Sequence, residues 1–137
     1  MPLLEKQLYV RQSILKGAGK GLFTSKPIAK GAKIVEYKGK ITTWKEVDDR
    51  KGLNGYIYYV SRNHVIDAWG HKKALARYAN DARGPVRTVG IRNNSKYDTE
   101  GLKVYIFAMK HIPAGSEILV GYGKEYWDII MDNMRVS

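Results

Sequence analysis

Cysteine is absent from the 137 residues, so the chain forms no disulfide and offers no thiolate zinc ligand and no cysteine nucleophile. The three histidines lie far apart in the sequence and form no His-Glu-x-x-His pattern, which argues against a metal site. No apolar run approaches the ~18–20 residues that a membrane span needs, and the N-terminal residues do not resemble a signal peptide. We therefore expect one domain over residues 1–137, without metal or membrane association.

Acidic residues are scarce: 13 Asp and Glu stand against 24 Lys and Arg, which gives a net charge of +11. A surplus of this size favours an acidic partner, such as nucleic acid or an acidic protein face. The cations are scattered along the chain rather than gathered in a tail, so a solvated basic surface explains the charge equally well.

Hydrophobic patterning predicts a mainly β chain with short helices, without the alternation of strands and helices seen in a Rossmann fold. Thr43 and Glu46 have capping-box spacing and favour a helix over 42–51. Residues 72–78 suggest one or two helical turns, 79–96 a loop, and 124–134 a terminal helix with one apolar side. The predicted strands cover residues 8–14, 33–37, 56–60, 64–68, 104–110 and 117–120.

The chain contains a weak internal repeat: residues 22–34 match residues 106–118 at a constant offset of 84. The identical pairs include Phe23 with Phe107 and Gly31 with Gly115. A strand, a turn closed by glycine and a second strand would explain the pattern, because glycine adopts the positive φ that such turns often need. The repeat suggests a pseudo-symmetric β fold, although two amphipathic hairpins can also resemble each other by chance.

Three further features can carry chemistry. The glycine-rich segment 17–23 is either a plain turn or a place where backbone closely approaches a flat ligand. Tyr37 and Tyr122 each follow one copy of the repeat, and facing tyrosine rings form a narrow apolar channel that suits an extended lysine side chain. Tyrosines at such places are otherwise packing residues. Asn80 offers a donor and an acceptor to a ligand, or else closes an Asx-turn.

Four segments, at residues 17–41, 65–70, 76–81 and 104–123, occur in an order and spacing that together resemble the SET family over residues 9–127. The segment GAGKGLF, followed by IAKGAKIVEYKGKI, is similar to the family's first motif, which contacts the cofactor. VIDAWG is similar to the strand before the central motif, and ARYAND to the central asparagine motif. VYIFAMKHIPAGSEILVGYG is similar to the final motif, which ends in the catalytic tyrosine.

The resemblance implies a role for each matched position. Tyr122 corresponds to the catalytic tyrosine and also borders the cofactor, while Tyr37 and Tyr97 line the lysine channel. Asn80 binds the amino-acid end of S-adenosylmethionine. The remaining cofactor-binding positions implied by the resemblance are Gly19, Lys20, Gly21, Leu22, Arg77, Tyr78, Asp81 and Trp127.

The resemblance also implies a β-clip-like fold in which the C-terminal segment threads through the chain like a knot. The sequence departs from the family pattern at Asp81, where the family has histidine, and in an insertion over residues 83–92. Cysteine-rich modules before or after the domain are missing. A C-terminal helix over 124–137, with Tyr126 and Trp127, is therefore expected to cap the site, unless a second subunit of a homodimer covers it.

The activity implied is methyl transfer from S-adenosylmethionine to a protein lysine, leaving S-adenosylhomocysteine. The substrate implied is a histone or nucleoid-associated protein, in the cytoplasm of a bacterial or viral-type system or in a eukaryotic nucleus. With Val120 two residues before the catalytic tyrosine and Tyr97 filling the channel, we expect mainly monomethyl-lysine. The alternatives are a non-catalytic basic module that binds nucleic acid or peptide, and a β-clip domain that binds a sugar or cofactor.

Overall fold

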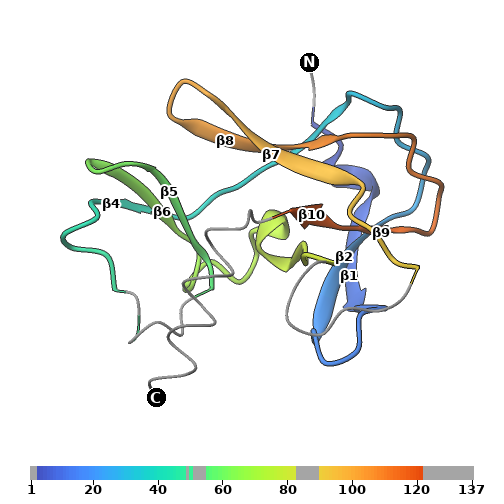
Figure 1. The fold of residues 1–137 in the computed structure, drawn as a ribbon, viewed down its shortest axis with the longest axis horizontal. Coiled ribbons are helices and arrows are strands. Elements are labelled where there is room, and N and C mark those ends of the chain that lie inside the picture. The colour runs from blue at the N-terminus through green and yellow to red at the C-terminus, as the bar shows by residue number, and fades with distance from the viewer. Residues whose placement is uncertain (1–2, 49, 51–54, 83–89, 122–137) are drawn as a thin grey trace.

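The computed structural model describes residues 3–48, 50, 55–82 and 90–121, which form three small β-sheets (Figure 1). The first sheet has the order β1-β2-β9, the second β10-β7-β8-β3, and the third β4-β6-β5. The strands are β1 (Leu8–Gln12), β2 (Lys20–Thr24), β3 (Lys33–Glu36), β4 (Lys40–Thr42), β5 (Ile57–Ser61), β6 (His64–Asp67), β7 (Ser95–Glu100), β8 (Lys103–Ala108), β9 (Glu117–Ile118) and β10 (Val120–Gly121).

The prediction of a mainly β chain is confirmed, and the only helices among the described residues are two short 3-10 turns. These are η1 (Glu5–Gln7) and η2 (Leu75–Tyr78), and η2 lies within the helical turns predicted over 72–78. In this part of the chain no helix is long and apolar enough to cross a membrane. The predicted terminal helix over 124–137 lies outside the described residues.

The helix predicted over 42–51 is wrong where the structure describes this segment. A hydrogen-bonded turn follows β4, in which the Glu46 amide donates to Thr43 Oγ1 at 3.2 Å. The predicted cap is thus present, but no apolar stripe follows it, and Trp44 is exposed. Without a face to bury, the capped turn does not extend into a helix, because tertiary packing supplies most of a short helix's stability.

The loop predicted over 79–96 ends earlier than expected, since β7 begins at Ser95. The sequence of β7, SKYDTE, is polar because most of its side chains face solvent. Its backbone is nevertheless paired on both sides, antiparallel to β8 and parallel to β10. Tyr97 therefore stands on a strand rather than in a loop.

The internal repeat is a structural one. Ile28 and Ile112, which are equivalent under the offset of 84, form a bridge with two backbone N–O distances of 2.8 Å. β2 pairs with β9, and β3 pairs with β8, so each repeat copy lends a strand to the other copy's sheet. Gly31 and Gly115 have φ values of 87° and 84°, as the predicted glycine turns require.

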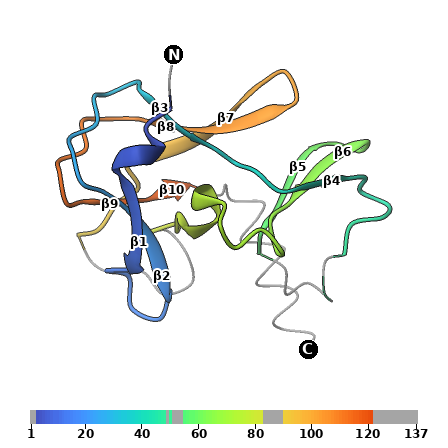
Figure 2. The same ribbon diagram turned by 180° about the vertical axis from the view of Figure 1, so that it is seen from behind.

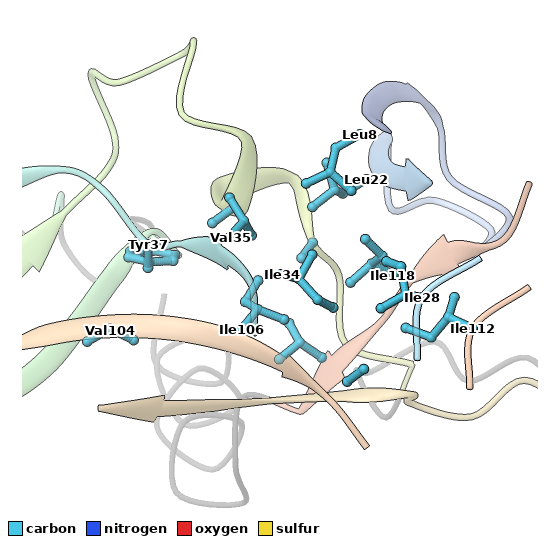
Figure 3. Close-up of a cluster of buried hydrophobic side chains, with 14 of the residues drawn as sticks. Leu8, Leu22, Ile28, Ile34, Val35, Tyr37, Val104, Ile106, Ile112 and Ile118 are labelled. Carbon is cyan, nitrogen blue, oxygen red and sulfur yellow. The ribbon is translucent and has the colours of Figure 1, made fainter. Parts of the chain in front are cut away.

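The two repeat copies also supply the core. Each contributes isoleucines that are fully buried between the first two sheets (Figure 3). Burying one such side chain stabilises the fold by about 1.5–3 kcal/mol. The paired turns and the first two sheets form one body, and the third sheet projects away from them (Figures 1 and 2). The isoleucines of the two copies are Ile28, Ile34, Ile106, Ile112 and Ile118, and Ile66 of β6 belongs to the same core.

Candidate functional site

A cavity of about 690 Å³ opens between the β1–β2 hairpin tip, the segment before β5 and the η2 region. Its volume lies within the ~300–1,000 Å³ range typical of small-molecule sites. Gly19 has a φ of +74°, a conformation that side chains rarely adopt, and this brings bare backbone to the cavity wall. The lining residues are Ala18, Gly19, Lys20, Gly55, Tyr56, Trp69, Lys72, Arg77, Tyr78 and Asn80.

Asn80 joins three segments at the back of this cavity. Its Nδ2 donates to the carbonyl oxygen of Lys20 at 2.9 Å. The backbone carbonyl oxygen of Asn80 accepts a hydrogen bond from the Val120 amide at 2.9 Å, and Asn80 forms a parallel β-bridge with Leu119. The asparagine is therefore fixed against both the glycine-rich hairpin tip and the final strand.

Glu117 is a buried carboxylate directly behind the hairpin tip, only 3% exposed. Its Oε2 accepts from Ser13 Oγ at 2.7 Å, and its Oε1 accepts from the Ile14 amide at 2.8 Å. Asn80 Nδ2 lies 3.4 Å from Oε2. One carboxylate thus fixes the approach to the hairpin tip and contacts Asn80. Sequence reasoning missed it, since an isolated glutamate ordinarily indicates a solvent-facing position.

Glu117 also explains the glycine at position 21. A Cβ built on Gly21 would lie 2.8 Å from Glu117 Cδ and 3.2 Å from Ser13 Cα. The structure thus places Gly21 beside the buried carboxylate, whereas Leu22 is wholly buried in the core. Neither of these two residues lines the cavity.

A second, narrower cavity of about 80 Å³ adjoins the first. Tyr37, Tyr58 and Tyr97 form one wall, with ring centroids 5.2–6.0 Å apart in tilted or edge-to-face arrangements. Tyr37 is buried, and its hydroxyl donates to the Tyr56 carbonyl oxygen at 2.7 Å. Burial, with a smaller contribution from Asp98, raises the pKa of Tyr58 above its ordinary value, so its hydroxyl stays protonated at neutral pH.

Sequence reasoning found Tyr37 and Tyr97 but not Tyr58. The alternation of side chains along a strand was the available signal. Tyr58 lies on β5, opposite the buried Ile66 of β6, so that its ring turns toward the same side as the core.

The two cavities share a wall made of Gly55, Tyr56 and Arg77. The Arg77 guanidinium stacks on the Tyr56 ring at 4.1 Å and donates to the carbonyl oxygens of Ala68 and Trp69 at 3.0 and 2.7 Å. Its buried Nε has no hydrogen-bond partner among the described residues. Arg77 therefore lines both cavities while its guanidinium is held by two backbone carbonyl groups.

Trp69 is a second lining residue that the sequence did not reveal. It packs edge-on against Tyr56, with ring centroids 6.0 Å apart, and the Arg50 guanidinium lies over its ring, 4.3 Å from the centroid. The segment VIDAWG thus supplies an aromatic side chain to the larger cavity as well as the strand β6.

The final strand runs between the asparagine segment and β7. Leu119 bridges Asn80 on one side, and β10 pairs in parallel with β7 on the other. Asn94 secures this strand, because its Oδ1 accepts from the Leu119 amide at 3.0 Å and its Nδ2 donates to the Glu117 carbonyl oxygen at 2.9 Å. Val120 is wholly buried in the core and does not line the narrow cavity.

Asp81, where the SET resemblance implies a histidine, does not line the larger cavity. It is 6% exposed, and its carboxylate accepts from Asn93 Nδ2 at 2.8 Å. Asn93 Oδ1 in turn accepts from the Ala82 amide at 2.8 Å. The aspartate therefore joins the asparagine segment to the segment that precedes β7.

The structure brings together Gly19, Lys20, Arg77, Tyr78 and Asn80 around the larger cavity, and Tyr37 and Tyr97 around the narrower one. Arg77 belongs to both.

Tyr122, Tyr126 and Trp127 lie outside the described residues, so their predicted roles stay predictions. Among the described residues no group of three His, Asp or Glu side chains could hold a metal ion.

Comparisons with known proteins point in one direction. A family model described as "SET domain" matches residues 19–123. The chain is 25% identical over 131 residues to N-lysine methyltransferase KMT5A-A of Danio rerio, covering 88% of this chain and 36% of that protein. It is 29% identical over 133 residues to histone-lysine N-methyltransferase ASHH1 of Arabidopsis thaliana, covering 90% and 26%.

A solved structure is also similar. The methyltransferase domain of human PR domain-containing protein 2 superposes with a TM-score of 0.64 at 26% identity, covering 90% of this chain and 79% of that chain. By contrast, this chain spans only part of the two curated relatives: 36% of the length of the first and 26% of the length of the second.

Proposed function

The chain belongs to the SET-domain family, and we propose that it is a protein-lysine methyltransferase that uses S-adenosylmethionine. The observation that carries the proposal is the pair of adjoining cavities. The larger one has the volume for a nucleoside-sized ligand, and the narrower one has the aromatic walls that suit a lysine side chain. They share Gly55, Tyr56 and Arg77, so two ligands could meet at that wall.

The residues around the larger cavity fit the cofactor. Gly19 exposes backbone, Asn80 is rigidly held, and the Arg77 guanidinium places positive charge at the wall that both cavities share. Lys20 and Lys72 add positive charge near which a carboxylate would be stabilised. When bound, S-adenosylmethionine supplies a methyl group that is electrophilic because its sulfur is positively charged.

The chain's own residues would prepare the lysine. The rings of Tyr37, Tyr58 and Tyr97 hold the apolar part of the side chain in line and exclude water from its amine. An amine in such surroundings loses its proton more readily, because burial disfavours the charged form. Alignment and desolvation of this kind lower a reaction barrier by several kcal/mol, about 7–11 kcal/mol in the most favourable intramolecular cases. By family resemblance, Tyr122 would position the amine through its hydroxyl.

We further propose that the substrate is a histone or a nucleoid-associated protein. Several relatives are histone-lysine N-methyltransferases by name, which supports the substrate class. The net charge of +11 supports contact with nucleic acid near that substrate. We expect residues 124–137, with Tyr126 and Trp127, or the partner subunit of a homodimer, to cover the site. The enzyme would act in the bacterial or virus-infected cytoplasm, or in the nucleus of a eukaryotic host.

The proposal is tested by cofactor binding and by labelled methyl transfer. S-adenosylhomocysteine should raise the unfolding temperature, since a ligand that binds only the folded state stabilises it. Labelled S-adenosylmethionine should then transfer its methyl group to a lysine in a mixture of histones and cell lysate, located by mass spectrometry. The Tyr122→Phe variant should keep the stabilisation and lose at least ~10²-fold in rate, the scale of one positioned polar group.

The same measurements separate the competing class of function. A non-catalytic basic module would bind nucleic acid or peptide, yet S-adenosylhomocysteine would leave its unfolding temperature unchanged. Methyl transfer at the wild-type rate by the Tyr122→Phe variant would remove Tyr122 from its assigned role.

A further inference from the structure

Positive charge is unevenly distributed over the molecule. Residues 6–35 contain seven Lys and Arg and no Asp or Glu, and residues 101–116 contain two Lys and no acid. Four acids border these runs: Glu5 lies 3.9 Å from Lys38, Glu100 forms an ion pair with Lys33, Glu117 is buried, and Glu36 is half-buried on β3. Among the described residues, the part of the fold built by the two repeat copies therefore carries more exposed cations than exposed acids.

The repeat brings lysines from both runs to one place. The bridge between Ile28 and Ile112 joins the two glycine turns, and the Ala108 amide donates to the Ala32 carbonyl oxygen at 2.9 Å. Lys30 and Lys110 lie between these two points of pairing, on adjacent backbones.

Lys26 is the repeat equivalent of Lys110 and lies on the same pair of turns. Its carbonyl oxygen accepts from Thr24 Oγ1 at 2.7 Å and from Gln7 Nε2 at 3.2 Å, so its backbone is fixed. Lys26, Lys30 and Lys110 are exposed, and none forms an ion pair with a described residue. We call these three residues the lysine turn face.

Adjacent like charges on paired backbones reduce stability unless an anion contacts them. The lysine turn face lies at the Thr24 end of β2, whereas the larger cavity is lined by Lys20 at the other end. A five-residue strand separates these ends by roughly 13 Å at about 3.3 Å per residue. Both views show the paired turns on the opposite side of the molecule from the third sheet (Figures 1 and 2). A partner bound there would leave both cavities open.

We propose that the lysine turn face binds the phosphate backbone of double-stranded DNA. Lysines offer point charges to phosphates without reading the base sequence. Binding of single strands ordinarily adds aromatic rings on which bases stack. The exposed Trp44, on the turn after β4, packs instead against the exposed Tyr59 of the third sheet, which favours a duplex at the turns. The choice of DNA rests on the proposed histone or nucleoid substrate, and the face would hold the enzyme near it.

The test compares two variants that each lose three positive charges. The face variant carries Lys26→Gln, Lys30→Gln and Lys110→Gln. The control variant carries Lys40→Gln, Lys45→Gln and Arg62→Gln, which removes exposed cations from the region of Trp44 and Tyr59. Binding of a fluorescent 20-base-pair duplex is followed by anisotropy at several salt concentrations, without cofactor or methyl transfer, so that this proposal and the proposed activity can fail separately.

The face variant should bind the duplex about 10-fold or more weakly at 100 mM salt. Its slope of log K against log salt should be shallower by about 2–3, since each phosphate contact contributes about 0.9. The control variant should bind within about twofold of wild type, and the Lys→Arg form of the face variant should restore binding, because it keeps the charge. A wild-type circular-dichroism spectrum and cooperative thermal unfolding would verify that the face variant is folded.

Three results would overturn the proposal. The first is equal loss of binding in the control and face variants, which would mean that only total charge matters. The second is single-stranded DNA that binds more tightly than the duplex. The third is polyglutamate that competes as well as DNA at equal charge concentration, because the face would then take acidic proteins.

Discussion

Replacing Glu117 with glutamine tests whether one buried carboxylate holds the cofactor end of the site together. Glutamine keeps the size of the side chain but offers one acceptor oxygen and one amide group. If the glutamine oxygen still accepts the hydrogen bond from the Ile14 amide, the NH₂ group takes the place of Oε2. It then faces Ser13 Oγ and Asn80 Nδ2, which both donate to Oε2 in the wild-type protein. The substitution therefore removes one strong hydrogen bond and sets two donors against each other at Asn80.

The size of the effect follows from this geometry. A hydrogen bond to a charged group contributes about 1.5–3 kcal/mol to stability, and burying a neutral amide instead of a carboxylate offsets part of the loss. We expect the Glu117→Gln variant to be about 2 kcal/mol less stable than wild type. For a domain of this size the unfolding temperature should fall by about 5–8 °C.

Cofactor affinity is the second readout for this variant. Asn80 and the hairpin tip both depend on Glu117, so binding of S-adenosylhomocysteine should weaken about 10-fold, which corresponds to about 1.4 kcal/mol. The control is Glu46→Gln, at an exposed carboxylate on the turn after β4, which should change stability by less than about 0.5 kcal/mol. Calorimetry that gives wild-type affinity and wild-type stability for Glu117→Gln would refute the reasoning.

Three further predictions concern the walls of the two cavities. Asn80→Ala should weaken S-adenosylhomocysteine binding by about 1–3 kcal/mol, because a buried partner is left unpaired, and unchanged calorimetric affinity would remove Asn80 from the site. Wild type should make mainly monomethyl-lysine and Tyr97→Phe should yield dimethyl product; early trimethyl-lysine by mass spectrometry would show that Tyr97 does not restrict the channel. Since the pKa of Tyr58 is raised, its contribution to stability is full below about pH 10 and is lost as pH rises through the raised value. Unfolding of Tyr58→Phe should therefore show a smaller loss of stability above pH 10, and an identical loss would contradict the assigned environment.

The pseudo-symmetric body could be predicted from the sequence because its signals are local. Gly31 and Gly115 mark turns that need positive φ, and the apolar residues around them alternate as strands do. The helix over 42–51 was predicted from the same kind of local signal and was wrong. Thr43 and Glu46 do form the capping contact. The sequence around them does not show, however, that the fold offers no apolar surface against which a helix could pack.

The candidate site was less predictable because it depends on contacts between distant segments. The burial of Glu117 becomes apparent only when Ser13 and Ile14 are brought against it. In the sequence, Tyr58 and Trp69 cannot be distinguished from other aromatic residues of strands and loops. Only the folded position of the third sheet places them beside the two cavities. Motif matching found the residues that a family pattern names, and missed those whose position depends on folding.

The pairing of Ser13 with Glu117 has a consequence for protein synthesis. The two residues are 104 positions apart, so Glu117 is added to the growing chain about 5–20 s after Ser13 at ordinary elongation rates. During that interval β2 can pair with β1, yet the edge that later receives β9 stays open, and open edges invite pairing with other chains. The hairpin tip likewise cannot form its hydrogen bonds to the Glu117 carboxylate until β9 has been synthesised. A nascent chain of this protein should therefore gain cofactor binding only after Glu117 has been synthesised, which makes the earlier ribosome-bound intermediates the stage most exposed to aggregation.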